Sequence, residues 1–257
     1  MIEYLILAQL KLQSPQLKPI QSVPIVSAKS ALVYDMPSQN IVYQKNIHDK
    51  VPIASLTKLM TAYIIMQEHQ LSEVVKISKV ASQTAGSSMN LAPYDQLTIK
   101  QLLEGLLINS GNDAAVALAI HNSKNVPQFV QKMNLYAKML ELNSTSFQNP
   151  MGFDHPLNYS TAADLLKLSQ LCFANDTIKE ISQTKTLTIR SKLGKIYKLL
   201  NTNSELQNYL KVTGLKTGKT PQAQECFIGT NQNQQISIVL NSKNRFLDTK
   251  NLLDWSK

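Results

Sequence analysis

The residues best suited to chemistry are a serine and a lysine three positions apart, in Ser55-Leu-Thr-Lys58. They open a run with helical apolar spacing, Ala54–His69. Positions i and i+3 share a helix face, so the Ser55 hydroxyl and the Lys58 amine can meet. A serine becomes a nucleophile when a base takes its proton, and lysine is such a base once burial or a nearby cation lowers its pKa. The pair therefore predicts acyl transfer at Ser55.

This motif is weak alone, because Ser182-Gln-Thr-Lys185 matches it as well. An ordinary pair on a helix surface explains either copy when it is taken by itself. Context favours Ser55, since it follows Pro52 and Ala54 and opens a strongly apolar helix, whereas Ser182 lies in a polar stretch.

Two further motifs follow along the chain. Ser110-Gly-Asn112 lies in a tight turn where a hydroxyl and an amide can face a cleft, although the pattern is common and a helix cap also explains it. Lys216-Thr-Gly218 occurs once, at the end of a β-like run. A strand edge there can hold a substrate backbone, with a cation, a hydroxyl for a carboxylate and a glycine that permits close approach. A strand running into a turn is the alternative.

The elements that must position these motifs are strands at both ends of the chain and helices in the middle. Apolar periodicity and turn residues predict strands at 30–35, 39–44, 186–190, 212–216, 226–230 and 236–240, and helices at 54–69, 98–108, 113–121, 126–142, 161–173 and 248–255. Hairpins are expected around Pro37 and around Asn231–Gln235. If the two ends share one sheet, the helical block is an insertion beside it.

The ordered set Ser-x-x-Lys, Ser-x-Asn and Lys-Thr-Gly is far more specific than any single motif. With it, the chain resembles the low-molecular-weight penicillin-binding proteins that are serine-type D-Ala-D-Ala carboxypeptidases, the peptidase S11 kind. The resemblance runs from about Ser27 to Trp255. Its supporting strings are Ala54-Ser-Leu-Thr-Lys-Leu-Met-Thr61, Leu106-Leu-Ile-Asn-Ser-Gly-Asn-Asp-Ala-Ala115, Asn149-Pro-Met-Gly-Phe153, Tyr159-Ser-Thr-Ala162 and Gly214-Leu-Lys-Thr-Gly218. It implies an α+β fold of the β-lactamase/transpeptidase type, an antiparallel sheet flanked by helices with an inserted helical region and the site between them.

The resemblance also implies catalytic roles. Ser55 would be the acylated nucleophile, Lys58 its general base, and Ser110 a proton relay. Asn112 would hold either the substrate amide or Lys58. The oxyanion hole would consist of the backbone N–H groups of Ser55 and Lys219.

A second set of implied roles concerns substrate binding. Lys216 would lower the Lys58 pKa and attract the substrate carboxylate, which Thr217 would bind beside Gly218. Arg245 falls where the family often has a carboxylate-binding arginine, although a surface arginine is the alternative. Ser87, in Gly86-Ser-Ser88, fits a loop over the site.

The chain departs from the family pattern at three places. Lys219 stands where histidine commonly follows Lys-Thr-Gly, and Ala163 stands where arginine is frequent after Ser-Thr-Ala. Gln224-Glu225 replaces a usual Gly-Tyr pair, so that strand is expected to pack differently.

The activity implied by the resemblance is removal of the terminal D-Ala from peptidoglycan stem peptides through an acyl-enzyme that β-lactams also form, with no cofactor. The enzyme would act in the periplasm or cell envelope, in wall biogenesis and cell shape. A D,D-endopeptidase would use the same residues. A class A β-lactamase needs a Glu-x-x-x-Asn loop, which we do not find, and a Ser-His-Asp hydrolase needs a Gly-x-Ser-x-Gly elbow, which does not occur. A wall-binding module without activity would not need all of Ser55, Lys58, Ser110 and Lys216.

Composition fits a soluble globular protein, with 43% hydrophobic and 17% charged residues among 257. The net charge of +9 is scattered, so nucleic acid is not an expected partner. No run of 18 apolar residues is present, so no transmembrane anchor is expected. We expect a lead-in or remnant signal at 1–26, where Ile2–Leu10 is the export candidate, a carboxypeptidase domain at 27–257, and no β-rich second domain after it.

The cysteines and histidines predict neither a disulfide nor a metal. Cys172 and Cys226 are expected to be two buried free thiols rather than a disulfide. The four histidines are far apart in sequence, and none pairs with another at metal-ligand spacing: His48, His69, His121 and His155.

Overall fold

Strands from the two ends of the chain form one antiparallel sheet, in the order β2-β1-β9-β8-β7. The computed structural model describes residues 23–203 and 212–256, so the expected export segment lies outside the described residues. The bounds are Ser30–Asp35 (β1), Asn40–Lys45 (β2), Thr213–Thr220 (β7), Gln224–Thr230 (β8) and Gln235–Ser242 (β9). The expectation that both ends share a sheet is therefore confirmed.

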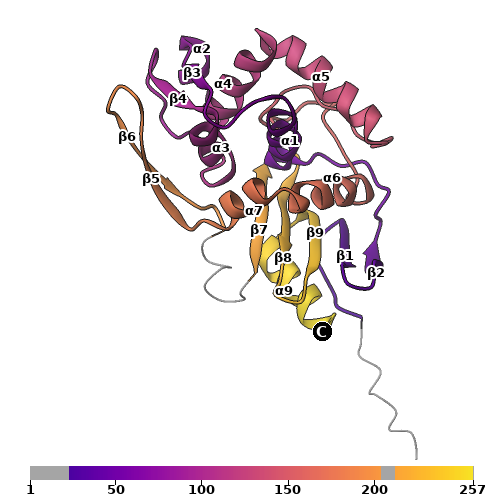
Figure 1. Ribbon diagram of the computed structural model, residues 1–257. Coiled ribbons are helices and arrows are strands. Elements are labelled where there is room, and N and C mark those ends of the chain that lie inside the picture. Colours follow the sequence, from indigo (N-terminus) through magenta and orange to yellow (C-terminus); the bar gives the residue numbers. More distant parts are fainter. Residues whose placement is uncertain (1–22, 204–211, 257) are drawn as a thin grey trace, which may run out of the picture.

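Alternating side chains divide this sheet into two buried faces. Along β9, Ile238 and Leu240 join the main core, whereas Val239 joins a smaller core under α9 (Arg245–Trp255). Period-two alternation with both faces apolar is the pattern of a sheet covered on both sides. Helix α6 (Ala162–Ala174) covers the main-core face. Figure 1 shows the sheet between these helices.

The inserted block is helical and lies at one end of the sheet (Figure 1). Its centre is α1, which follows a short 3₁₀ helix, η1, and is buried along most of its length. The remaining helices pack around it, against its neighbouring helices or along the sheet edge. The bounds are Ala54–Thr57 (η1), Lys58–Glu68 (α1), Lys79–Ser82 (α2), Ile99–Leu107 (α3), Asn112–Ser123 (α4), Val126–Met139 (α5) and Asp176–Gln183 (α7).

Two small hairpins complete the described fold. Strands β3 (Val74–Lys76) and β4 (Gln96–Thr98) pair beside α4, and β5 (Thr186–Arg190) and β6 (Ile196–Leu200) form a separate ribbon. Sequence patterns predicted β5 but not β3, β4 or β6. The strands predicted at 30–35 and 186–190 have the predicted ends, the other predicted helices and strands exist with shifted ends, and the first predicted helix begins as a 3₁₀ turn.

The structure also tests two chemical expectations. Cys172 and Cys226 are both free and buried, as expected. Burial raises the pKa of the two thiols to about 12 and about 11 respectively. In the described part of the chain, no helix combines the length and apolarity needed to cross a membrane.

Candidate active site

The Ser55 hydroxyl and the Lys58 amine meet where η1 passes into α1. Lys58 Nζ lies 2.9 Å from Ser55 Oγ, and Lys58 is fully buried. The second Ser-x-x-Lys does not repeat this arrangement, because α7 ends at Gln183 and Thr184 is extended, so Lys185 lies outside the helix of Ser182. Only the first motif therefore keeps its two side chains on one continuous helical segment.

Lys58 is held by three oxygen atoms. Besides Ser55 Oγ, Nζ donates to Asn112 Oδ1 at 2.7 Å and to the Met151 carbonyl at 2.8 Å. Asn112 Nδ2 in turn donates to the Ala85 carbonyl, which fixes Oδ1 toward the lysine. Two of the three partners of Nζ can only accept. A neutral amine has two N–H groups and one lone pair, so when Lys58 is uncharged its lone pair is left for the Ser55 O–H.

The electrostatics of the region favour that neutral form. Burial lowers the pKa of Lys58 well below its usual value, the charge of Lys216 lowers it further, and Asp113 opposes the shift. Burial, with the nearby Arg245 charge, brings the pKa of Lys216 to about 7. A lysine whose pKa is lowered in this way can act as a base near neutral pH.

The Ser110-Gly-Asn112 turn lies where α3 passes into α4. Ser110 is buried with φ +57°, and Asn112 is the first residue of α4. The Ser110 hydroxyl makes no hydrogen bond to Ser55 or Lys58 within residues 23–203 and 212–256, so the structure brings Asn112, but not Ser110, into direct contact with Lys58. The Asn112 N–H donates to the Ser87 carbonyl at 2.7 Å, which ties the exposed 86–88 loop to this turn.

Strand β7 carries the third motif along the same site. A Cβ added to Gly218 would lie 3.0 Å from Ser55 N, so the strand passes directly beside the Ser55 backbone. Lys216 is buried and donates to the Thr217 carbonyl, while the Thr217 hydroxyl lies 2.6 Å from that of Thr202. Arg245 Nη1 donates to the Gly218 carbonyl at 3.0 Å. The arginine is thus part of this region rather than a free surface residue.

Two of the departures from the family pattern contact each other. Lys219 and Glu225 are opposite residues of β7 and β8, and their side chains form an ion pair at 2.9 Å. Glu225 also accepts a hydrogen bond from the backbone N–H of Arg245 at 3.2 Å. Gln224 adopts φ +52° before an irregularity in the β8 register, a conformation for which glycine is better suited. At these positions the two strands are therefore joined by a charged cross-strand pair.

Two groups that sequence reasoning did not assign also shape the site. The Asn149–Phe153 loop supplies the Met151 carbonyl, and Gly152 (φ +91°) lies against Ala54 and Ser55. Asp113 is fully buried and accepts hydrogen bonds from the Ser88 hydroxyl and from the N–H groups of Met89 and Leu91. The string Asn-Pro-Met-Gly was visible in the sequence, but nothing indicated that its backbone would contact Lys58.

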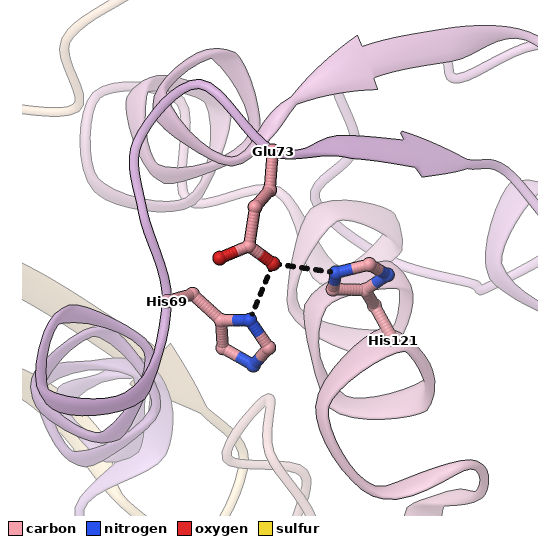
Figure 2. Close-up of side chains that lie close together, drawn as sticks. All are labelled: His69, Glu73 and His121. Atoms are coloured by element: carbon pink, nitrogen blue, oxygen red, sulfur yellow. Dashed lines mark hydrogen bonds and ion pairs between the residues drawn. The ribbon is translucent and has the colours of Figure 1, made fainter.

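Outside this region, two of the histidines that sequence spacing did not relate lie close together in space. His69, Glu73 and His121 converge, with the three prospective ligand atoms within 4.8 Å of one another (Figure 2). Motif spacing could not reveal this, because 52 positions separate the two histidines and the packing of α1 and α4 brings them together.

Together, the described groups provide a hydroxyl with an adjacent buried amine of lowered pKa, a strand edge and two further basic side chains, which suit acyl transfer on a carboxylate-bearing peptide. Residues 18–244 match the family model for D-alanyl-D-alanine carboxypeptidases. The chain belongs to this family. The D-alanyl-D-alanine carboxypeptidase DacF of Bacillus subtilis is 33% identical over 89% of this chain and 62% of its own length, and DacC of Escherichia coli is 34% identical over 90% and 62%.

Solved structures agree with this membership in the carboxypeptidase family. The crystal structure of the Streptomyces K15 DD-transpeptidase is similar with a TM-score of 0.83 and 30% identity, over 90% of this chain and 97% of that one. The implied α+β fold, an antiparallel sheet with an inserted helical region, is confirmed. The chain spans less than two thirds of the length of the two curated relatives above.

Proposed function

We propose that the protein is a serine D,D-carboxypeptidase that removes the terminal D-Ala from peptidoglycan stem peptides. The observation that carries this proposal is the environment of Lys58. Its amine contacts the Ser55 hydroxyl, its other two partners can only accept hydrogen bonds, and its pKa is lowered by burial and by Lys216. As a member of a family of wall carboxypeptidases, it would act outside the cytoplasm.

In the proposed acylation step, neutral Lys58 takes the Ser55 proton while Oγ attacks the carbonyl carbon between the two D-Ala residues. The Ser55 and Lys219 N–H groups would stabilise the oxyanion. When the C–N bond breaks, the proton returns from Lys58, with Ser110 as relay, to the departing D-Ala amine. The negative charge of the substrate carboxylate would be bound by the Thr217 hydroxyl with Lys216 and Arg245 nearby.

In the second step, water attacks the acyl-enzyme and Lys58 again accepts the proton. Within the described residues, no carboxylate hydrogen-bonds to Ser55 or Lys58. A dedicated acidic base for deacylation is therefore not in contact with the nucleophile. A penicillin adduct should form at Ser55 and hydrolyse slowly, in contrast to a class A β-lactamase.

The test is D-alanine release from a peptide ending in Lys-D-Ala-D-Ala. Wild type should release D-alanine and Ser55→Ala should not. Ser182→Ala is the matched control, because it removes the serine of the second Ser-x-x-Lys and should behave as wild type. Release by Ser55→Ala at the wild-type rate would refute the nucleophile. Folded wild type that is acylated by penicillin but releases no D-alanine would instead indicate an endopeptidase, which a crosslinked muropeptide would reveal.

A second candidate is D,D-transpeptidation, favoured by the similarity to the solved Streptomyces K15 structure of that name. The same acyl-enzyme would then be attacked by an amine instead of water. Adding a glycine acceptor to the release assay separates the two. Acceptor-containing product at the expense of hydrolysis would favour the transpeptidase, and unchanged hydrolysis would favour the carboxypeptidase.

A further inference from the structure

Three side chains from three segments converge at the far end of the helical block. His69 follows the last residue of α1, Glu73 precedes β3, and His121 lies in the last turn of α4. Glu73 Oε2 lies 2.8 Å from His69 Nδ1 and 3.5 Å from His121 Nε2 (Figure 2). Two imidazole nitrogens thus face a single carboxylate oxygen.

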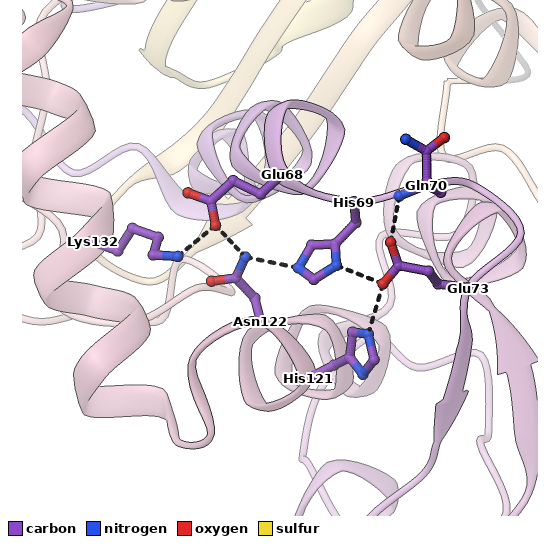
Figure 3. A network of polar contacts seen from close by, with 7 residues as sticks. All are labelled: Glu68, His69, Gln70, Glu73, His121, Asn122 and Lys132. Carbon is purple, nitrogen blue, oxygen red and sulfur yellow. Dashed lines mark hydrogen bonds and ion pairs between the residues drawn. The ribbon is translucent and has the colours of Figure 1, made fainter.

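Neighbouring groups hold the carboxylate in this orientation. Glu73 Oε1 accepts the Gln70 N–H at 2.6 Å, which leaves Oε2 for the two histidines (Figure 3). The Gln70 and His69 contacts therefore fix both oxygens of the Glu73 carboxylate. The three side chains are only partly exposed, at 15% for His69, 37% for Glu73 and 27% for His121.

The spacing suits a small divalent ion. Zinc binds nitrogen and oxygen at about 2.0–2.1 Å, so tetrahedral ligands lie about 3.4 Å from one another. The three ligand atoms here lie within 4.8 Å of one another, and two of the separations are 2.8 and 3.5 Å. Rotations of the partly exposed side chains suffice to close them around one ion. The fourth position would be left to water.

The backbone also favours a cation at this place. A helix carries partial negative charge at its C-terminus, and α1 and α4 both end here, at Glu68 and Ser123. The negative ends of two helices and the Glu73 carboxylate therefore all favour a cation at this place. The ammonium group drawn in this network, that of Lys132, is paired with Glu68 (Figure 3).

We infer that His69, Glu73 and His121 form a binding site for a divalent transition-metal ion, with zinc as the best fit to two imidazoles and one carboxylate. The ion joins the C-terminal ends of α1 and α4. Lys58 and Asn112 lie at the N-terminal ends of the same helices, about 15 Å away for an eleven-residue helix. The ion is therefore structural, and it does not take part in the reaction at Ser55.

The hydrogen bonds of the Asn122 side chain must rearrange when zinc binds. Asn122 Nδ2 lies 3.0 Å from His69 Nε2, and also donates to Glu68 Oε2 (Figure 3). A histidine that binds metal through Nδ1 carries its proton on Nε2 and needs an acceptor there. Rotation of the Asn122 amide by half a turn places Oδ1 at that position. The amide then gives up its hydrogen bond to Glu68 Oε2, and the Ser123 hydroxyl, which donates to Oδ1 at 2.6 Å, has to accept from Nδ2 instead. The zinc-bound form should therefore show the opposite Asn122 amide orientation.

The test is calorimetric titration of the full chain with Zn²⁺, after removal of metal by a chelator and of any affinity tag. Wild type should bind one ion, and His121→Gln and Glu73→Gln should each weaken binding at least tenfold. His48→Gln is the matched control, because His48 is an exposed histidine outside the cluster, and it should bind as wild type does. Equal affinity of wild type and both cluster variants, or no saturable binding by wild type, would overturn the inference.

A second measurement does not depend on the variants being stable. A hundredfold excess of Zn²⁺ over its Kd should raise the wild-type Tm by about 5–10 °C. Cobalt bound in place of zinc should give visible absorption bands typical of a low-coordinate nitrogen and oxygen site. Absence of both effects would identify the cluster as a hydrogen-bonded network only. Neither readout involves D-alanine release, so the outcome is independent of the proposed enzymatic activity.

Discussion

Gly152 lies so close to Ala54 that a Cβ at position 152 would stand 1.9 Å from the Ala54 carbonyl oxygen. The same Cβ would lie 3.0 Å from Ser55 N. Gly152 has φ +91° and Ala54 has φ +47°, so two backbone conformations that are rare for residues with side chains meet directly beside Ser55. The carbonyl of the preceding residue, Met151, accepts a hydrogen bond from Lys58. One turn of the Asn149–Phe153 loop therefore sets the positions of both catalytic candidates.

The first prediction is that Gly152→Ala lowers both stability and acylation. The backbone of 54–55 would have to move, which displaces Ser55 and the Met151 carbonyl. We expect a loss of about 2–4 kcal/mol in the free energy of unfolding and at least a tenfold slower reaction with a fluorescent penicillin. Gly194→Ala is the control, because Gly194 has φ +89° but nothing within 4 Å of an added Cβ. If both variants lose the same stability, backbone strain alone explains the effect and the contact with Ala54 is unimportant.

The second prediction concerns the pH dependence of acylation. The charge of Lys216 is the second cause, after burial, of the lowered Lys58 pKa. Lys216→Met removes this charge, so the Lys58 pKa should rise and the acidic limb of the acylation profile should move to higher pH. Lys219→Met removes an exposed cation on the same strand and should leave the limb in place. Unchanged midpoints in Lys216→Met would exclude Lys216 as a determinant of the Lys58 pKa.

The third prediction uses the same variant to measure stability. Lys216 has a folded-state pKa of about 7, against about 10.4 in an unfolded chain. Between these values the unfolded state binds more protons, so this group makes wild-type stability rise with pH. Lys216→Met lacks that contribution. Relative to wild type, it should be most stable near pH 6, by an amount on the order of a few kcal/mol, and should lose this advantage progressively above pH 7, so that most of it is gone near pH 10. If Lys216→Met and wild type differ in free energy of unfolding by the same amount at both pH values, the pKa of Lys216 is not lowered in the folded state.

Much of the fold was predictable because its main elements have strong periodicity. The β1–β2 hairpin and, in the C-terminal third, β5, β7, β8 and β9 were identified from apolar runs bounded by turn residues, and long amphipathic helices from their 3.6-residue spacing. The elements that were missed carry weak signals. Strands β3 and β4 have three residues each, and α7 (Asp-Thr-Ile-Lys-Glu-Ile-Ser-Gln) is mostly polar. They form because tertiary packing, rather than local sequence, supplies their stability.

The site was predictable only where a motif contains the residues that meet. Ser55 and Lys58 belong to one helical turn, so their contact followed from spacing. The contact of Lys58 with Met151, 93 positions away, depends on a backbone carbonyl, which no residue type reveals. The approach of His69 to His121 was hidden for a second reason, which is that the packing of two helices brings together residues far apart in the sequence. Long-range contacts set by helix packing leave no periodic signal in a single sequence.

The fourth prediction is that Arg245 contributes to substrate affinity. Its Nη1 is bound to the Gly218 carbonyl, whereas its Nε is buried and has no hydrogen-bond partner among the described residues. A substrate carboxylate beside β7 can accept from this guanidinium. Arg245→Gln should lower kcat/KM for D-alanine release about 10–100-fold, mainly through KM, as expected for loss of a charged hydrogen bond. Arg190→Gln, at the exposed β5 strand, is the control. An unchanged KM in Arg245→Gln would remove this residue from the substrate site.

The fifth prediction is that Asp113→Asn shifts the acidic limb in the direction opposite to Lys216→Met. Asp113 raises the Lys58 pKa, so loss of its charge should lower that pKa and move the limb to lower pH. The variant also replaces an acceptor of the Ser88 and Leu91 donors by an amide, which should cost about 1–3 kcal/mol of stability. Asp154→Asn removes a carboxylate that binds Thr220 and Gln222 but does not affect the Lys58 pKa, and should not shift the limb. If the acidic limb of the acylation profile shifts in the same direction in Lys216→Met and Asp113→Asn, a group other than Lys58 controls acylation.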